Sequence, residues 1–376
     1  MNRVSSISVG AVLVASLGFS QVPADIAPKL VDMGRNVCPA DTAKLYKPLQ
    51  LAPPAGVKMM RDVSYGPDAR EIMDVFWGEK GGGNRPVLIY VSGGAGNKIE
   101  PVDSGDAFYD NIMYWAVKNG MTGVNVQRRA AGQGAEWDQA GKDIGTVVQW
   151  VHKNIAMYKG NPNRVFIWSH SAGNPPVATY LGRPELYGPD GIGLKGAILM
   201  SPAPFNIAPV TVGGGGGGRG PGGPPAAGAG GMCPSGSPFG GGARGGPGGG
   251  GAAKNGPGGG GPGGQAKGGP GGQAKGTGGR GGGGGRGAVD PQVQLDRSLL
   301  PGLKAAKISF FLASAELDPA NMPSFIDTLA DQLKMAGKSP TVAVFKAHSH
   351  MSEVFSPNTP DTSVSGPVLK WMKSVK

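Results

Sequence analysis

One stretch near the middle of the chain, residues 165–181, constrains the fold more than any other. It opens with four apolar residues at 165–168, which are typical of a short buried strand. Small residues follow, and residues 177–181 continue as a helix. The two prolines at 175–176 fit the first turn of that helix, where backbone N–H groups have no partner within the helix. The stretch therefore predicts a strand, a sharp turn and a helix in succession.

A serine at the centre of this turn is a candidate nucleophile. The sequence Ser169-His170-Ser171-Ala172-Gly173 follows the pattern G-x-S-x-G, with Ser169 in place of the first glycine. In this pattern the turn lifts the serine hydroxyl above the sheet, and the next backbone N–H faces a developing oxyanion at the positive end of the helix. Ser171 is thus the predicted nucleophile and Ala172 a predicted oxyanion donor. Simple capping of the helix by Ser171 is the alternative.

The chain has only four histidines, which restricts the choice of a base. His152 falls within a helical pattern, and His170 lies within the turn itself, where it cannot face back toward Ser171 in the productive way. His348 and His350 remain, in the loop predicted after the last strand. Being two positions apart, they point to opposite sides of an extended backbone. His350, which lies deeper in the loop, is the preferred base, and His348 is the alternative.

A carboxylate behind the base would fix the tautomer of the imidazole and stabilise the imidazolium. Asp318 follows the strand predicted at residues 308–312, in the loop where the order nucleophile, acid, base along the chain places the acid. Glu316 is closer to the strand and is the competing candidate. Asp318 is therefore the predicted acid.

The oxyanion hole is predicted at a second strand end. The apolar run at residues 86–91 is typical of a strand buried on both faces, and Ser92-Gly93-Gly94-Ala95 follows it. Open α/β sheets bind ligands beyond the carboxyl ends of their strands. We expect Gly93 or Gly94 to donate a backbone N–H to the oxyanion together with Ala172, and Ala95 is a further candidate.

The remaining apolar runs predict an α/β fold. Further strands are expected at residues 63–66, 72–77, 124–126, 197–200, 308–312 and 342–345, and further helices at residues 108–119, 143–158, 323–335 and 368–375. Two antiparallel strands followed by alternating strands and helices predict a mostly parallel central sheet with helices on both faces. Residues 24–60 are rich in proline and lack periodicity, which predicts an arm packed on the surface.

A glycine-rich segment interrupts the second half of the chain. Residues 213–287 contain 42 of the 71 glycines and seven Lys or Arg without any Asp or Glu, so they supply +7 of the formal net charge of +11. Such a composition cannot bury enough apolar surface to offset the entropy of ordering, and we expect a disordered insertion. The rest of the chain is only mildly basic, and no nucleic-acid partner is expected.

The N-terminus predicts export, to the periplasm or the exterior. Arg3 precedes an apolar run at residues 9–19 with small residues at its end, which is typical of a signal peptide. A run of eleven residues is too short to cross a bilayer, so no stable membrane span is expected. Cys38 and Cys233 suit an oxidising compartment in number, and whether they pair is left open. The predicted divisions are a signal peptide at 1–22, an arm at 23–60, an α/β domain at 61–212 and 288–376, and the insertion at 213–287.

Taken together, the motifs resemble those of a known family. They are Val63-Ser64-Tyr65-Gly66, Met73-Asp74-Val75, Leu88-Ile89-Tyr90-Val91-Ser92-Gly93-Gly94-Ala95, Asn161-Pro162-Asn163-Arg164-Val165 and Ser169-His170-Ser171-Ala172-Gly173. As an ordered set they look like the α/β-hydrolase carboxylesterases of the lipase and feruloyl-esterase-like group. The resemblance covers about residues 60–212 and 288–376. In two places the chain departs from the family: Ser92 replaces the His of an H-G-G-G motif, and Ser169 replaces the first elbow glycine.

The resemblance implies a function as well as an α/β-hydrolase fold. It implies that Ser171 is the nucleophile, Asp318 the acid and His350 the base of an exported serine hydrolase. Such an enzyme would cleave a small-molecule carboxylic ester through an acyl-enzyme, with no cofactor or metal. An amidase or formamidase would use the same three residues, and a non-catalytic binding protein on the same fold is a further alternative. The oligomeric state, the ester and the acyl size cannot be read from the sequence.

Overall fold

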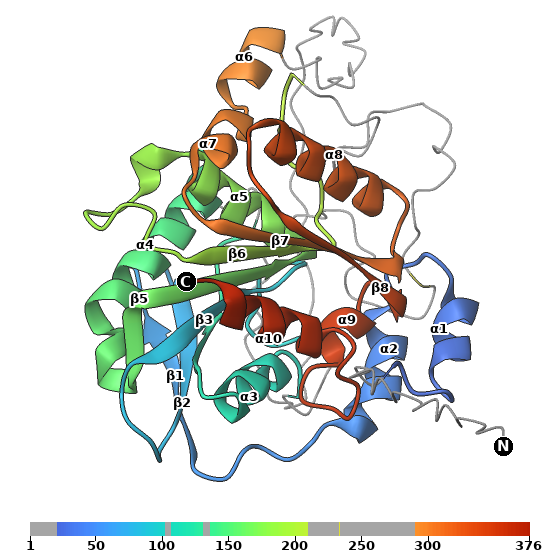
Figure 1. The fold of residues 1–376 in the computed structure, drawn as a ribbon. Helices are drawn as coiled ribbons and strands as arrows, with labels where there is room; N and C mark the ends of the chain where they lie inside the picture. Colours follow the sequence, from blue (N-terminus) through green and yellow to red (C-terminus); the bar gives the residue numbers. More distant parts are fainter. Residues whose placement is uncertain (1–20, 102–106, 131–135, 210–232, 234–289) are drawn as a thin grey trace, which may run out of the picture.

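The structure, a computed structural model, describes residues 21–101, 107–130, 136–209, 233 and 290–376 (Figure 1). Nearly all of the predicted signal peptide lies outside the described residues. The same holds for the predicted glycine-rich insertion, of which only Cys233 is described. The statements below concern the described part of the chain.

An eight-stranded sheet organises the molecule, in the order β1-β2-β4-β3-β5-β6-β7-β8. The strands are β1 (Val57–Ser64), β2 (Ile72–Gly78), β3 (Arg85–Val91), β4 (Thr122–Val126), β5 (Gly160–His170), β6 (Gly196–Met200), β7 (Ser309–Leu317) and β8 (Thr341–Ser349). The β1–β2 and β2–β4 pairs are antiparallel, and every later pair is parallel. The prediction of a mostly parallel sheet that opens with an antiparallel pair is confirmed.

Helices cover both faces of this sheet, as predicted (Figure 1). On one face lie α4 (Gln139–Asn154), α5 (Asn174–Gly182), α7 (Leu300–Ala305) and α8 (Asn321–Met335), with α6 (Pro291–Asp296) beyond α7. On the other lie α1 (Ala27–Met33), α2 (Pro39–Tyr46), α3 (Asp110–Lys118), α9 (Ser352–Phe355) and α10 (Ser365–Ser374). None of the helices in the described ranges is both long and apolar enough to cross a membrane.

The two faces of the sheet form two hydrophobic cores, which explains why the inner strands are continuously apolar. In β5, Val165 and Ile167 join the core under α4, α5, α7 and α8, whereas Phe166 and Trp168 join the core on the opposite face. Successive side chains of a strand point to opposite faces, so both positions of each pair must be apolar. All four side chains are fully buried.

The N-terminal arm is more regular than its sequence indicates. It folds into α1 and α2, and β1 begins at Val57, six residues before the predicted strand. Leu30 and Tyr46 of the two helices are fully buried in the second core. Helices of seven and eight residues have only about two turns. This is too short for an apolar repeat to show in the sequence.

A disulfide joins this arm to the second half of the chain, which answers the question of whether the two cysteines pair. Cys38 precedes α2 and is bonded to Cys233, with 5.1 Å between their Cα atoms. The backbone N–H of Cys233 also donates to the carbonyl of Val37, at 3.3 Å. The disulfide thus fixes the arm covalently to Cys233.

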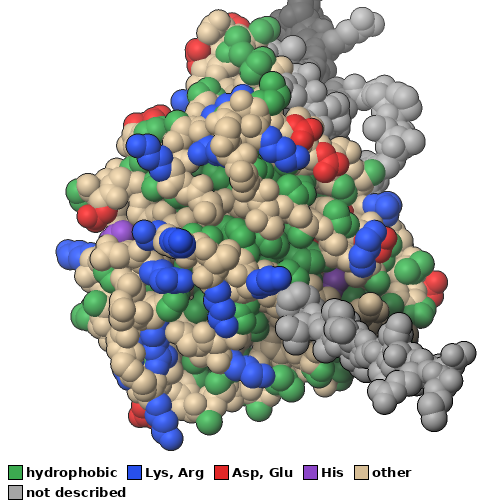
Figure 2. Space-filling view, in the orientation of Figure 1, with side chains coloured by type: hydrophobic (Ala, Val, Ile, Leu, Met, Phe, Trp, Pro, Cys, Tyr) green, Lys and Arg blue, Asp and Glu red, His purple; other side chains and the backbone are tan. Residues whose placement is uncertain are grey.

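The face of the molecule shown in Figure 2 carries more basic than acidic side chains. In Figure 2, Lys and Arg side chains are spread over the visible face among apolar and uncharged groups, with Asp and Glu between some of them. This pattern agrees with a folded part that is only mildly basic. Some of the buried charges are paired, as where Arg61 and Lys98 both contact the fully buried Asp74 at 2.7 Å.

Candidate active site

Ser171 occupies a strained turn between β5 and α5. Its φ of 53° lies in the left-handed region, which non-glycine residues rarely adopt outside functional sites. Gly173 permits the turn, because a Cβ at this position would lie 2.4 Å from the carbonyl oxygen of Val91 on β3. Ser169, which replaces the first glycine of the pattern, is buried, and its hydroxyl donates to Oδ1 of Asn174 at 2.8 Å. It therefore links the end of β5 to the first residue of α5.

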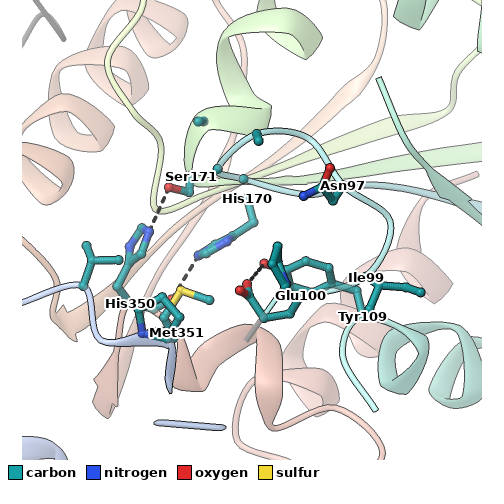
Figure 3. A pocket seen from close by; sticks show the side chains of 15 residues that line it. Asn97, Ile99, Glu100, Tyr109, His170, Ser171, His350 and Met351 are labelled. Atoms are coloured by element: carbon teal, nitrogen blue, oxygen red, sulfur yellow. Dashed lines mark hydrogen bonds between the residues drawn. The ribbon is translucent and has the colours of Figure 1, made fainter. Parts of the chain in front are cut away.

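The structure brings the three predicted residues into one chain of hydrogen bonds. His350 directly follows β8, and its Nε2 lies 2.9 Å from Oγ of Ser171 (Figure 3). Its Nδ1 lies 2.8 Å from Oδ1 of Asp318. An ionised carboxylate can only accept, so Nδ1–H donates to Asp318 and Nε2 accepts the hydroxyl proton of Ser171. This is the arrangement that a nucleophile and its base require.

Asp318 is fully buried and is held through both carboxylate oxygens. Its Oδ2 accepts from the hydroxyl of Ser201 at 2.5 Å and from the backbone N–H of Ala315 at 2.8 Å. Arg35 of the N-terminal arm donates to its main-chain carbonyl at 2.9 Å. Ser201, which directly follows β6, is not among the site residues predicted from the sequence. A serine at a strand end is too common to stand out without the position of its partner.

The two competing candidates have other partners. His348 lies inside β8, with Nδ1 2.9 Å from the hydroxyl of Ser352 and Nε2 2.7 Å from that of Ser363. Burial lowers the pKa of His348 to about 4, so its imidazole is neutral at ordinary pH. Glu316 pairs with Lys346 at 3.0 Å and accepts from a β8 backbone N–H, so it fixes the sheet edge. The roles of His350 as base and Asp318 as acid stay predictions.

The predicted oxyanion loop lies against the nucleophile. A Cβ on Gly93 would lie 2.7 Å from Cβ of Ser171, so only glycine allows this approach. Gly94 has a φ of 52°, and Gly96 donates to the carbonyl of Gly93 at 2.9 Å, which closes the turn. Among the described residues, no hydrogen bond uses the backbone N–H of Gly93, Gly94 or Ala172 as donor. Their role as oxyanion donors stays a prediction.

A pocket of about 210 Å³ opens in front of Ser171 (Figure 3). Its wall is mostly apolar and includes Val37, Pro39, Ile99, Pro101, Tyr109 and Met351. One acid also lines it, Glu100, which accepts a hydrogen bond from the hydroxyl of Tyr109 at 2.6 Å. Val37 and Pro39 flank the disulfide-bonded Cys38, so the N-terminal arm supplies part of the pocket wall. The sequence analysis did not assign the arm to the site.

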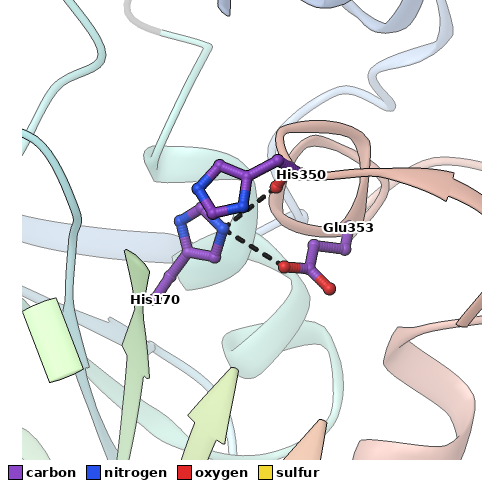
Figure 4. Close-up of side chains that lie close together, drawn as sticks. All are labelled: His170, His350 and Glu353. Carbon is purple, nitrogen blue, oxygen red and sulfur yellow. Dashed lines mark hydrogen bonds and ion pairs between the residues drawn. The ribbon is translucent and has the colours of Figure 1, made fainter. Parts of the chain in front are cut away.

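A buried group of His170, His350 and Glu353 adjoins the nucleophile (Figure 4). Nε2 of His170 lies 3.0 Å from the carbonyl oxygen of His350 and 3.2 Å from Oε1 of Glu353. Burial lowers the pKa of His170 well below its ordinary value. Burial, together with the negative charge of Asp318, raises the pKa of Glu353 well above its ordinary value. Both shifts favour the neutral forms of these groups. Two imidazoles and a carboxylate are ligand types for zinc, but both nitrogens of His350 are already hydrogen-bonded.

Comparison with known proteins places the site in a family context. Residues 73–180 match the family model BD-FAE, a span that contains Gly93, Gly94 and Ser171. Human cocaine esterase is 30% identical over 115 residues, which are 27% of this chain and 19% of that protein. The match thus spans about a fifth of the length of this curated relative.

Solved esterases share the fold over most of the chain. Esterase B from Lactobacillus rhamnosis superposes with a TM-score of 0.52 at 10% identity, covering 94% of both chains. A thermostable esterase from Pseudomonas putida gives 0.52 at 12% identity, covering 90% of this chain and 88% of that one. A truncated carbohydrate esterase from gut microbiota gives 0.51 at 11% identity, covering 86% and 98%. The chain therefore has the α/β-hydrolase fold and resembles the carboxylesterases built on it.

Proposed function

We propose that this chain hydrolyses carboxylic esters through an acyl-enzyme formed on Ser171. The observation that carries the proposal is the unbroken hydrogen-bonded path from Asp318 through His350 to Ser171, which ends at a pocket. The BD-FAE match and the esterase relatives support an ester as the substrate class.

The geometry defines the acylation step. Oγ of Ser171 attacks the ester carbonyl carbon while its proton passes to Nε2 of His350, and Asp318 stabilises the imidazolium that forms. The backbone N–H groups of Gly93, Gly94 and Ala172 would bind the negative oxygen of the tetrahedral intermediate. The imidazolium then gives its proton to the departing alcohol oxygen as the carbon–oxygen bond breaks. Water attacks the acyl-enzyme with His350 again acting as base, which releases the acid and restores Ser171.

The neutral state of His170 favours this step. Its ring centroid lies 4.5 Å from that of His350, so a proton on His170 would repel the imidazolium that forms on His350. Burial holds the pKa of His170 low and removes this repulsion at neutral pH. The raised pKa of Glu353 likewise favours its neutral form, which would add no competing charge.

The test is Ser171→Ala, with the exposed Ser324→Ala on α8 as the matched control. We expect turnover of p-nitrophenyl acetate to fall by about 10⁴-fold or more in Ser171→Ala and to stay unchanged in the control. A fluorophosphonate probe should label the wild type at Ser171. Wild-type turnover by a folded Ser171→Ala protein would refute the assignment, and a wild type that takes no label would favour a binding protein. The rates of hydrolysis of p-nitrophenyl acetate and of an anilide with the same acyl group measure esterase against amidase activity.

We also propose that the protein acts outside the cytoplasm. The disulfide between Cys38 and Cys233 supports this, because such bonds persist in oxidising compartments. Mass spectrometry of the protein from the producing cell, alkylated before reduction, should find the bond intact and an N-terminus near residue 23. A chain that begins at Met1 with both cysteines alkylated would contradict the proposal.

A further inference from the structure

The side chain of Arg128 lies directly behind the predicted oxyanion hole. Arg128 follows β4, and its Nη2 donates to the carbonyl of Ala172 at 2.9 Å and to that of Ser92 at 3.3 Å. Ala172 belongs to the nucleophile turn, and Ser92 immediately precedes Gly93. A single guanidinium nitrogen therefore joins the two loops that carry the predicted oxyanion donors. Only 2% of Arg128 is exposed.

The position of this side chain is fixed by its surroundings. The backbone N–H of Arg128 donates to the carbonyl of Gly96 at 3.0 Å. A Cβ on Gly96 would lie 2.8 Å from Cγ of Arg128, so the loop has glycine where the arginine stem passes. Arg70 donates to the main-chain carbonyls of Arg128 at 3.0 Å and Ala95 at 2.9 Å. The loop after β3 is thus built around Arg128.

No carboxylate in the described part of the chain forms an ion pair with Arg128. Its neighbour Arg129, by contrast, contacts Glu71 at 2.8 Å and Asp143 at 2.5 Å. Burial lowers the pKa of Arg128 to about 10, which leaves the guanidinium charged at neutral pH. A positive charge of this kind in a buried setting acts strongly on nearby dipoles and charges.

The contact with Ser92 places this charge on a peptide group that the reaction would use. The carbonyl of Ser92 and the N–H of Gly93 belong to the same peptide, and in a trans peptide they point in opposite directions. A charged donor on the carbonyl polarises the peptide and strengthens the N–H as a donor on the other side. The positive charge also lowers the energy of a negative oxygen bound there.

We propose that Arg128 is a positioning residue that holds the two halves of the oxyanion hole together and strengthens the Gly93 donor. The proposal rests on the proposed esterase function, because it needs an oxyanion at Ser171. Among the described residues, no hydrogen bond joins Arg128 to Ser171 or His350, and Arg128 would act through the backbone groups of Ser92 and Ala172.

The test compares Arg128→Met and Arg128→Lys with Arg85→Met, which removes the same charge at the opposite end of the neighbouring β3. We expect kcat/KM for p-nitrophenyl acetate to fall by about 10- to 100-fold in Arg128→Met with KM within about threefold. Arg128→Lys should recover part of the loss, and Arg85→Met should stay within about twofold of the wild type. Circular dichroism and Tm establish that each variant is folded.

A spectroscopic readout separates this role from simple packing. A trifluoromethyl ketone with a ¹³C-labelled carbonyl forms a hemiketal on a serine nucleophile, and NMR gives the pKa of its hydroxyl. We expect that pKa to rise by about one unit or more in Arg128→Met and by less in Arg128→Lys. An unchanged pKa in a folded variant would overturn the proposal. If Arg128→Met does not fold, an unchanged pKa in Arg128→Lys overturns it equally. A wild type that forms no hemiketal refutes the esterase function, and with it this proposal. If the wild type forms the hemiketal but its pKa is unchanged in the Arg128 variants, only the proposal about Arg128 fails.

Discussion

Gly93→Ala is the substitution whose effect follows most directly from the structure. The added methyl group would lie 2.7 Å from Cβ of Ser171, 3.2 Å from the carbonyl oxygen of His170 and 3.3 Å from Oγ of Ser171, where ordinary contact begins at 3.4 Å. The nearest contact must therefore widen by about 0.7 Å. The turn cannot retreat toward the sheet, because Gly173 already packs against the carbonyl of Val91. Relief must come from the Ser171 side chain or from the loop after β3.

Either movement disturbs the reacting geometry. A misplacement of about 1 Å costs about 100-fold in rate, so 0.7 Å predicts a loss of about 30- to 100-fold in kcat/KM. The 2.9 Å contact between Ser171 and His350 and the distance from the oxyanion donors to the substrate both change. Overpacking should also lower the free energy of unfolding by about 1–3 kcal/mol.

The assay is the hydrolysis of p-nitrophenyl acetate together with the rate of fluorophosphonate labelling. Gly82→Ala is the matched control, because a Cβ at Gly82 has no atom within 4 Å, and it should behave as the wild type. Urea unfolding monitors the stability of both variants. If Gly93→Ala keeps kcat/KM within about twofold of the wild type, the loop does not press on the nucleophile and the reasoning is wrong.

Three further predictions follow from contacts around the site. Ser201→Ala removes one of two donors to Oδ2 of Asp318 and should lower kcat about tenfold at constant KM in steady-state assays; an unchanged kcat would contradict this. Burial sets the pKa of His348 at about 4 in the folded protein, below its value of about 6.5 in the unfolded chain. The unfolded chain therefore binds the proton more readily, and the free energy of unfolding falls as the pH drops from about 6.5 to about 4. By pH 4 the loss of unfolding free energy due to His348 amounts to about 3 kcal/mol, and urea unfolding should show that His348→Gln does not undergo this loss. Parallel pH profiles of stability for the wild type and His348→Gln would refute the prediction. Cys38→Ser opens a loop closed over a separation of 195 residues, so the free energy of unfolding should fall by at most about 5 kcal/mol and KM should rise as Val37 and Pro39 loosen; equal values in the two proteins would exclude both effects.

The predicted site residues meet because each directly follows a strand. Ser171 follows β5, Asp318 follows β7 and His350 follows β8, and the carboxyl ends of parallel strands gather at one edge of the sheet. The sequence shows such strand ends as apolar runs that stop at polar or small residues. For this reason the fold class and the placement of these residues could be predicted without any long-range information.

The parts that could not be predicted depend on contacts between distant segments. Arg128 and Ser201 also follow strands, but their types are common there, and their partners become known only with the sheet order. The choice between His348 and His350 was open for a related reason. The strand β8 runs on to Ser349 with Ala347 at a φ of 59°, an irregularity that the alternation of side chains does not predict. The contribution of the N-terminal arm to the pocket depends on the disulfide, whose pairing the sequence left open.

The pocket takes part of its wall from the N-terminal arm and its proposed base from a residue more than 300 positions later, and this bears on the protein while it is being synthesised. Val37 emerges from the ribosome long before His350 and Met351, which follow it by more than 300 residues. A nascent chain therefore has no complete pocket and no base for Ser171 until residues 350 and 351 have been made. We expect an incomplete polypeptide to be inert toward the esters of the cell that makes it.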